Sequence, residues 1–349
     1  MSKIFGYVFF GAPLAGMDAA DAKLWSRRGR SHTVACAAAK TWGSADRLFK
    51  RGAMAALLYC FCAGTALADR KSCIVLEQRY EQIKSAAGSV ERNSLLFSAA
   101  AQNCLPLTRL LLDAGASLEA TDRLGNMPLA IAAKSGRGAI VAHFLDHSAP
   151  VNARNLEGST ALYLAAETGR LAIAKLLVEH KADPNIIGRS GISPLGAAAY
   201  EGNTELVSLL LSNGAEPRAN DVTGKSAIVY AAGRAYTKVV EQLIEAGADV
   251  NVRYGNDLTA LMWAAGHSEE AGSADMVETL KLIVSRGARL DDADDRGRTA
   301  LMIAAELGHR VATETLVAAG AVTTLRDKTG KSAADLAPDE ATRAIFAAK

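Results

Sequence analysis

Hydrophobic positions recur along most of the chain with a period of 33 residues. Each period holds two apolar segments of helical length with a short polar or glycine-containing turn between them. The first segment opens with a Thr/Ser-Pro/Ala-Leu type of triplet and runs to a pair of alanines, and the second is rich in leucine. The triplets begin at Met127, Thr160, Ser193, Ser226, Thr259, Thr299 and Ser332, with spacings of 33, 33, 33, 33, 40 and 33, and Ser94 begins a degenerate copy one period earlier. Such a period predicts stacked helical units, each of which hides its apolar side against the next.

The last residues of each period predict where its second helix ends. Most periods close on a Gly-Ala pair, as at Gly115 and Gly214. Glycine suits the residue after a helix because the backbone there is often left-handed. Ser148 and Lys181 stand at this position in two of the periods. If their backbone is left-handed too, we expect each to cost about 1 kcal/mol.

The triplets, the paired alanines such as Ala165 and Ala166, the leucine-rich runs and the closing Gly-Ala pairs resemble the ankyrin repeat. The resemblance covers roughly residues 94–349. It implies an all-α ankyrin-repeat solenoid of stacked helix-turn-helix units with hairpin-like loops, made of seven repeats in 94–331 and a C-terminal capping half-repeat in 332–349. The histidine that usually follows the family's Thr-Pro-Leu start is replaced, so its hydrogen bonds between repeats are not implied here; its place is taken by Ala130, Tyr163, Gly196, Val229, Met262 and Met302.

Residues 69–93 predict an N-terminal capping helix. Ile74, Leu76, Tyr80 and Ile83 lie among charged and polar residues in this segment. Their spacing predicts an amphipathic helix that covers the first repeat and turns a polar side outward, as the ends of repeat arrays require.

The segment 47–68 has the three-part plan of a secretory signal peptide. A basic start at 47–51 precedes an apolar run at 53–63, and small residues stand at both positions that a signal peptidase reads. We expect cleavage between Ala68 and Asp69. No membrane span would then remain, since the apolar run is shorter than the roughly 20 residues that cross a bilayer. An uncleaved anchor or a chance apolar helix is the alternative.

Residues 1–46 precede this signal. We expect them to be either a disordered extension or sequence ahead of the true start, near Leu48 or Met54. A second apolar stretch at 4–16 is an alternative signal. The mature chain is expected in the periplasm of a bacterium, or secreted from it.

Cleavage would remove Cys36, Cys60 and Cys62 and would leave Cys73 and Cys104. Two thiols in an oxidising compartment suggest one disulfide, which would tie the capping helix to the first repeat. The alternative is two buried thiols that pack as small apolar groups.

The one spacing of 40 rather than 33 locates an insertion of seven residues within 266–275. Glycines and polar residues there predict a longer loop between two helices of one repeat. Insertions in repeat arrays often lie on a binding face, whereas a tolerated surface loop is the alternative.

Charge argues against nucleic acid as a partner. The chain carries 39 Lys and Arg against 37 Asp and Glu, but residues 1–68 hold nine of the basic and three of the acidic ones. Residues 69–349 therefore keep 30 basic and 34 acidic residues, a net charge of −4. A nucleic-acid binder would need a concentrated basic face.

The sequence carries no recognisable catalytic, cofactor or metal motif in residues 69–349, so we expect no enzyme activity, no cofactor and no metal. His147 and His180 lie one period apart, too far for a shared zinc, and are interpreted as exposed residues at helix ends. Trp263 is interpreted as a core residue. The acidic run 291–295 lacks the offsets of a calcium loop and is interpreted as a solvated hairpin tip.

The resemblance implies that a partner docks on the loop tips and on the exposed side of the first helices, the concave face of the stack. Projecting the period onto the chain gives the candidate contacts at the tips, which are Arg123, Arg154, Glu157, Arg189, Lys225, Arg253, Tyr254, Arg296, Arg298 and Arg326. The candidates on the first helices are Glu167, Tyr200, Glu201, Arg234 and His267.

The sequence thus favours a monomeric, non-catalytic scaffold that binds a protein in the periplasm, where it would inhibit a toxic effector or protect an envelope enzyme. An effector that acts as an ankyrin adaptor in a host cell is the alternative.

Overall fold

The computed structural model describes residues 69–266 and 273–347. The expected extension 1–46, the signal 47–68 with Ala68, and most of the insertion 266–275, with His267, lie outside the described residues.

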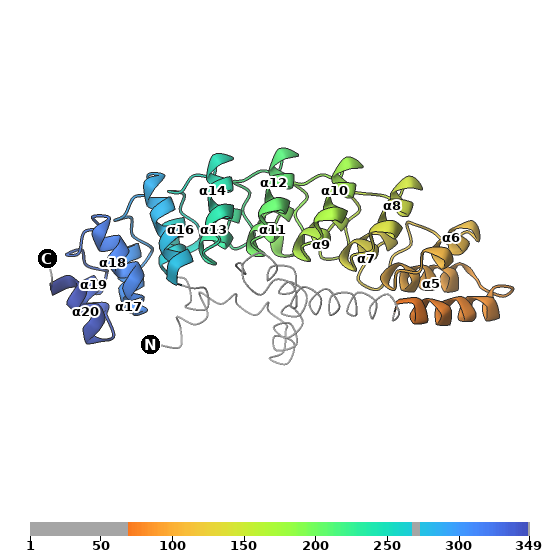
Figure 1. Ribbon diagram of the computed structural model, residues 1–349, viewed down its shortest axis with the longest axis horizontal. Helices are drawn as coiled ribbons and strands as arrows, with labels where there is room; N and C mark the ends of the chain where they lie inside the picture. The colour runs from red at the N-terminus through yellow and green to blue at the C-terminus, as the bar shows by residue number, and fades with distance from the viewer. Residues whose placement is uncertain (1–68, 267–272, 348–349) are drawn as a thin grey trace, which may run out of the picture. The chain divides into compact units, whose positions relative to one another are not determined.

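The described residues form a helical array (Figure 1). A helix over 69–83 comes first, and pairs of helices follow it. In chain order these are α5 (Ser89–Ala101), α6 (Leu105–Asp113), α7 (Pro128–Lys134), α8 (Gly138–Asp146), α9 (Ala161–Glu167), α10 (Leu171–Glu179), α11 (Pro194–Tyr200), α12 (Thr204–Ser212), α13 (Ala227–Ala232), α14 (Thr237–Glu245), α15 (Ala260–Ala265), α16 (Ser273–Ser285), α17 (Ala300–Glu306), α18 (Arg310–Ala318), α19 (Ala333–Leu336) and α20 (Glu340–Ala347). Apart from the isolated bridges 220–226 and 254–258, these residues contain no β-pairing. The all-α prediction is confirmed. The first helix of the first repeat, α5, begins at Ser89, whereas the repeat was expected to begin at Ser94.

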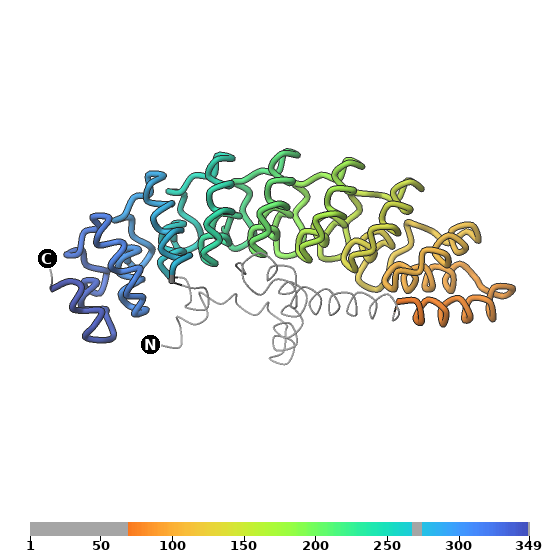
Figure 2. Tube along the Cα trace, in the orientation of Figure 1, coloured from red at the N-terminus to blue at the C-terminus, as the bar shows by residue number. Residues whose placement is uncertain are grey.

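The helices form two rows. The odd-numbered helices α5 to α19 each contact the next odd-numbered helix, and the even-numbered helices α6 to α20 form a second row behind them. Figure 2 shows that this part of the chain curves, and the labels in Figure 1 place the odd-numbered row on the inner side of the curve. We call the solvent-facing side of the odd-numbered helices the inner surface.

The paired alanines set the distance between repeats. Ala132, Ala165 and Ala198 have no exposed surface, and neither do their partners one position later. Such small side chains let successive inner helices approach closely. The space between the two rows is filled by large buried side chains such as Phe144 and Leu177. The serine or threonine that opens a triplet starts the helix as its N-cap, as Thr160 does by accepting the backbone N–H of Tyr163 at 3.2 Å.

Hairpins between repeats are held by an Asp or Asn at one fixed position. Its carboxylate or amide oxygen accepts the backbone N–H groups two and four residues later, at 2.7–3.0 Å. This holds for Asp122, Asn155, Asp221, Asp294 and Asp327. Gly188 and Tyr254 occupy the same position in two hairpins, and short 3₁₀ turns follow them, η2 (Arg189–Gly191) and η3 (Gly255–Asp257). The acidic run 291–295 is therefore structural in part, because Asp294 is buried and holds its hairpin.

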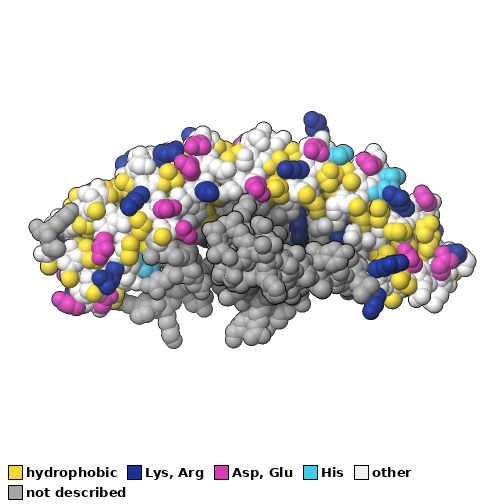
Figure 3. All heavy atoms as spheres, viewed as in Figure 1, with side chains coloured by type: hydrophobic (Ala, Val, Ile, Leu, Met, Phe, Trp, Pro, Cys, Tyr) yellow, Lys and Arg dark blue, Asp and Glu magenta, His cyan; other side chains and the backbone are white. Residues whose placement is uncertain are grey.

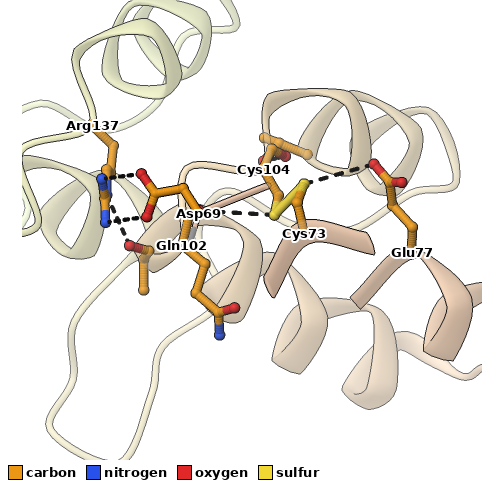
Figure 4. Close-up of a disulfide and its surroundings, with 8 residues drawn as sticks. Asp69, Cys73, Glu77, Gln102, Cys104 and Arg137 are labelled. Carbon is orange, nitrogen blue, oxygen red and sulfur yellow. Dashed lines mark hydrogen bonds and ion pairs between the residues drawn. A yellow bond between two sulfur atoms is a disulfide. The ribbon is translucent and has the colours of Figure 1, made fainter. Parts of the chain in front are cut away.

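The capping helix is attached to the array at two points, an ion pair at Asp69 and a bond at Cys73 (Figure 4). Arg137 Nη1 pairs with Asp69 Oδ2 at 2.9 Å, while Arg137 Nε donates to the carbonyl of Ala101 at 3.0 Å. The Cα atoms of Cys73 and Cys104 lie 5.3 Å apart, within the range of a disulfide, and the structure joins their sulfur atoms. The bond in the exported protein stays a prediction.

Burial of the capping helix differs from the expected pattern. Leu76 and Tyr80 are buried, as their spacing predicts. Ile74 was expected on the same face but is 45% exposed, because it lies about 200° around the helix from Leu76 at roughly 100° per residue. Two buried apolar side chains hold such a short helix weakly, so the covalent and ionic contacts near Asp69 and Cys73 matter for its docking.

Glycine at Lys181 should stabilise the protein. Lys181 has φ 67° and Ser148 has φ 61°, so both residues hold the left-handed backbone that glycine adopts without strain. We expect Lys181→Gly to raise the free energy of unfolding by about 0.5–1 kcal/mol in urea titrations. The matched control Lys175→Gly, inside α10, should lower it by about 1 kcal/mol. Equal losses in both variants would contradict the assignment of strain to Lys181.

The disulfide should stabilise the oxidised protein. It closes a sequence separation of 31 residues, and removing such a cross-link typically costs about 3–4 kcal/mol. We expect Cys73→Ser to lower the free energy of unfolding by that amount and to make stability insensitive to a thiol reductant. Mass spectrometry that finds both thiols alkylated in non-reduced, exported protein would contradict the bridge.

Candidate protein-binding surface

Aromatic side chains are concentrated in the middle of the array. Residues 69–349 contain ten aromatic residues, and six of them lie between Tyr163 and Trp263. Most of these six lie on or beside the inner helices α9, α11, α13 and α15. Tyrosine and tryptophan are the residue types most enriched at the energetic centres of protein interfaces.

The inner aromatic patch, as we call it, consists of Tyr200, Lys225, Tyr230, Arg234, Tyr236 and Trp263. Tyr200 ends α11, and its ring meets that of Tyr230 from α13 edge to face, with centroids 5.9 Å apart. Such an edge-to-face pair holds both rings in place. The patch therefore spans consecutive repeats and is ordered by contacts between them.

Arg234 lies between two tyrosine rings. Its guanidinium carbon is 4.4 Å from the ring centroid of Tyr200 and 5.6 Å from that of Tyr236. Arg234 Nε also donates to the hydroxyl oxygen of Tyr236 at 3.2 Å. Tyr236 in turn lies against Gly202, where an added Cβ would come within 2.8 Å of the ring. The guanidinium is thus held by cation–π contacts and one hydrogen bond although the residue is exposed.

Two further contacts order the other side of the patch. Lys225 Nζ lies 4.9 Å from the ring centroid of Trp263, in the next repeat. Tyr230 donates its hydroxyl hydrogen to Asp221, the residue that organises the hairpin before α13. Burial raises the pKa of Tyr230 well above its ordinary value, and the bond to Asp221 acts in the same direction.

Carboxylates border the patch on the side of the preceding repeats. Burial raises the pKa of Glu167, at the end of α9, and of Glu201, just after α11. Lys134 and Arg234 oppose these shifts for Glu167 and Glu201 respectively. Acidic and basic groups therefore both occur along the inner surface. Figure 3 shows the same mixing of charge on the face it draws, where no continuous basic stripe runs along the array.

The structure brings together the predicted residues Tyr200, Glu201 and Arg234, with Glu167 one repeat away. The predicted residue Lys225 lies against Trp263 of the next repeat. The structure also places Arg123 at an exposed tip.

Several predicted tip residues are engaged in the hairpins themselves. Arg154 Nε donates to the carbonyl of Gly158 at 3.0 Å, and Arg253 Nη1 donates to that of Ala293 at 2.9 Å. Arg326 binds the carbonyl of Gly330 at 2.6 Å in the same manner. These arginines stabilise their hairpins, so they are less available to a partner than was expected from the sequence.

Ion pairs hold other predicted tip residues. Arg189 pairs with Glu157 at 3.9 Å, and Arg296 pairs with Asp294 at 2.6 Å. Arg298 was expected at the surface, but its side chain is only 13% exposed. It pairs with Glu306 and with Asp327, which draws it inward.

Tyr254 was also expected at an exposed tip, and this placement is wrong. The residue is 7% exposed and stands where other hairpins have Asp or Asn. Its ring is buried inside the hairpin, and this burial raises the pKa of its hydroxyl.

Sequence reasoning missed Tyr230 and Tyr236. Tyr230 lies one period before Trp263, and no role was assigned to it from the sequence. Tyr236 follows the turn after α13, at a position that the repeat pattern leaves variable. The clustering of tyrosine in one stretch of an aromatic-poor chain was the signal that could have found both.

The described residues show no arrangement for metal chemistry. Residues 69–266 and 273–347 contain no group of three His, Cys, Asp or Glu side chains that could hold a metal ion. His147 and His180 are exposed, and the ring Nδ1 of each contacts a carbonyl of its own helix, at 2.8 and 2.9 Å. Trp263 is buried, as predicted. Within those same ranges no helix has the length and apolar character needed to cross a membrane.

Comparison with known proteins agrees with this geometry. The family model for ankyrin repeats in three copies matches residues 96–188, 185–254 and 237–327. The crystal structure of the human ASB11 ankyrin repeat domain superposes with a TM-score of 0.57 and 26% sequence identity, over 64% of this chain and 98% of that domain. No curated protein sequence matches significantly.

The buried Tyr163 and the half-buried Tyr230 should make stability fall at high pH. Burial holds the pKa of Tyr163 and Tyr230 above the value of about 10 that an unfolded tyrosine has. The unfolded chain then loses these protons first, so the stabilisation present below pH 10 is lost progressively as the pH rises toward the folded pKa values. Above about pH 10 the free energy of unfolding should fall less steeply in Tyr230→Phe than in the wild type. The two slopes should differ by up to roughly 1.4 kcal/mol per pH unit, the contribution of one proton. Identical slopes for the two proteins would contradict the assignment.

Proposed function

The chain belongs to the ankyrin repeat family, and from this premise we propose that it is a periplasmic scaffold that binds one protein partner through the inner aromatic patch. Ankyrin repeats are protein-interaction scaffolds and generally non-catalytic. The described residues fit that role, because the polar side chains of the hairpins serve mainly to hold the hairpins.

The preorganised patch supports the choice of this surface most strongly. Tyr200, Tyr230 and Arg234 are fixed by mutual contacts before any partner arrives. Ordering flexible side chains on binding costs roughly 0.5–1.5 kcal/mol each, and a patch already ordered avoids much of that cost. The second-row helices offer no comparable cluster within the described residues, since the ring contacts there are limited to His143 and His147.

Export is the part of the proposal that rests on the sequence. The tripartite segment 47–68 favours a cleaved signal, and bacterial origin is an inference from that plan. The adjacent positions of Cys73 and Cys104 are compatible with an oxidising compartment. In the periplasm such a scaffold would neutralise a toxic effector or shield an envelope enzyme by covering the partner's surface.

Capture of the partner should depend on the patch. The full chain serves as bait in an envelope fraction, beside the double variant Tyr200→Ala, Arg234→Ala. Removing one ring and the cation held on it should lower recovery of the captured protein by about ten-fold or more, as for central interface residues. Circular dichroism should show unchanged helicity.

The matched control is Arg109→Ala, which removes an exposed arginine from α6 in the second row of helices. It should leave recovery unchanged. Equal recovery by the wild type and the double variant would remove the patch from the proposal, and loss in the control as well would indicate binding through diffuse charge.

A further inference from the structure

Arginines in the hairpins and near the inner surface are mostly neutralised by their own chain. Arg137, Arg253, Arg296, Arg298 and Arg326 each pair with a carboxylate. Within 69–266 and 273–347, Arg234 and Lys225 are held differently, on aromatic rings, with no carboxylate within ion-pair distance. The backbones of Lys225 and Arg234 flank α13, and Trp263, the ring that holds Lys225, also lies against Gly233 beside Arg234.

Within the described part of the chain, Arg234 makes no hydrogen bond through the two terminal Nη groups of its guanidinium. Only Nε is used, in the bond to the Tyr236 hydroxyl. The two terminal Nη groups are the pair that a carboxylate engages with two parallel hydrogen bonds. Stacking on Tyr200 fixes the plane of this fork without consuming those donors.

Lys225 adds a second fixed cation to the patch. Its ammonium lies over Trp263, so its long side chain is already ordered. A cation–π contact attracts the charge without neutralising it. A partner that docks on α13 would therefore meet two positive charges, each held on an aromatic ring.

The neighbouring carboxylates are the main argument for a basic partner, and two observations weigh against it. Burial disfavours the charged forms of Glu167 and Glu201. A basic group of this chain also acts electrostatically on each carboxylate, Lys134 on Glu167 and Arg234 on Glu201. Glu201 also acts on Arg234 electrostatically from outside ion-pair distance. It would therefore compete weakly with an incoming carboxylate rather than block it.

Resting on the proposed function, we propose that the partner docks an acidic, partly apolar protein segment on the inner aromatic patch. A carboxylate of that segment forms a two-bonded pair with Arg234, another approaches Lys225, and apolar side chains between them cover Tyr200 and Tyr230. Residues 69–349 carry a net charge of −4, so the attraction for an acidic segment comes from Arg234 and Lys225 and not from the net charge.

Three synthetic peptides test this inference on the full chain by fluorescence anisotropy. They share one stripe of leucines at helical spacing and differ only in the residues that flank it, which are all Glu, all Gln or all Lys. We expect the Glu peptide to bind about ten-fold more tightly than the Gln peptide, and the Lys peptide to bind no better than the Gln peptide. Added salt should reduce the preference.

Variants assign the preference to residues. Arg234→Gln and Lys225→Gln should each remove most of the preference for the Glu peptide, whereas Arg109→Gln, on the second-row helix α6, should leave it intact. Glu201→Gln should strengthen binding of the Glu peptide, because it removes a competing charge. Preference for the Lys peptide, weaker binding of the Glu peptide to Glu201→Gln, or no preference at all would overturn the inference.

The two proposals fail in different ways. If the peptides show no preference for Glu but Tyr200→Ala, Arg234→Ala still weakens capture of the envelope partner, the acidic chemistry is wrong and the binding surface stands. If the peptides bind equally and the double variant captures as well as the wild type, both proposals fall.

Discussion

Close approach of successive inner helices is the interaction on which the rest of the molecule depends. Ala165 and Ala166 have no exposed surface, and equivalent pairs stand in each neighbouring repeat. Each pair lets one repeat lie directly against the next, so apolar side chains between the rows are buried only by stacking. A larger residue at these positions would separate repeats and expose their flanks. The array is therefore stable as a whole rather than as individual hairpins.

The same stacking builds the binding surface. Tyr200, Tyr230 and Trp263 come from three consecutive repeats, and their contacts exist only because those repeats are held at a fixed spacing. Glycine makes the closest of these approaches possible, as at Gly202 beneath Tyr236 and at Gly188, where a Cβ would come within 2.5 Å of the Tyr163 ring. A regular scaffold thus carries an irregular patch, in which the variable positions of the repeat hold the side chains available to a partner.

The sequence predicted the architecture because the period constrains many positions at once. The helix starts at Thr160 and Ser193, the left-handed residues Ser148 and Lys181 and the buried Trp263 all follow from the pattern. The repeat pattern did not predict which side chains at the hairpin tips are exposed. Arg298 is drawn inward by Asp327, which lies about 30 residues away in sequence. Tyr254 is buried by a hairpin geometry that the period does not specify. Tyr236 was missed because its role comes from a side-chain contact with Arg234 and from its approach to Gly202 of the preceding repeat.

Hydrogen–deuterium exchange on the full chain, with and without its captured partner, tests the central claim most directly. The backbone amides of α11, α13 and the turn 233–236 should exchange more slowly in the complex, while those of the second-row helices α8 and α10 should be unchanged. Protection confined to the second row, or to hairpins distant from α13, would contradict an inner binding surface centred on Tyr200 and Arg234.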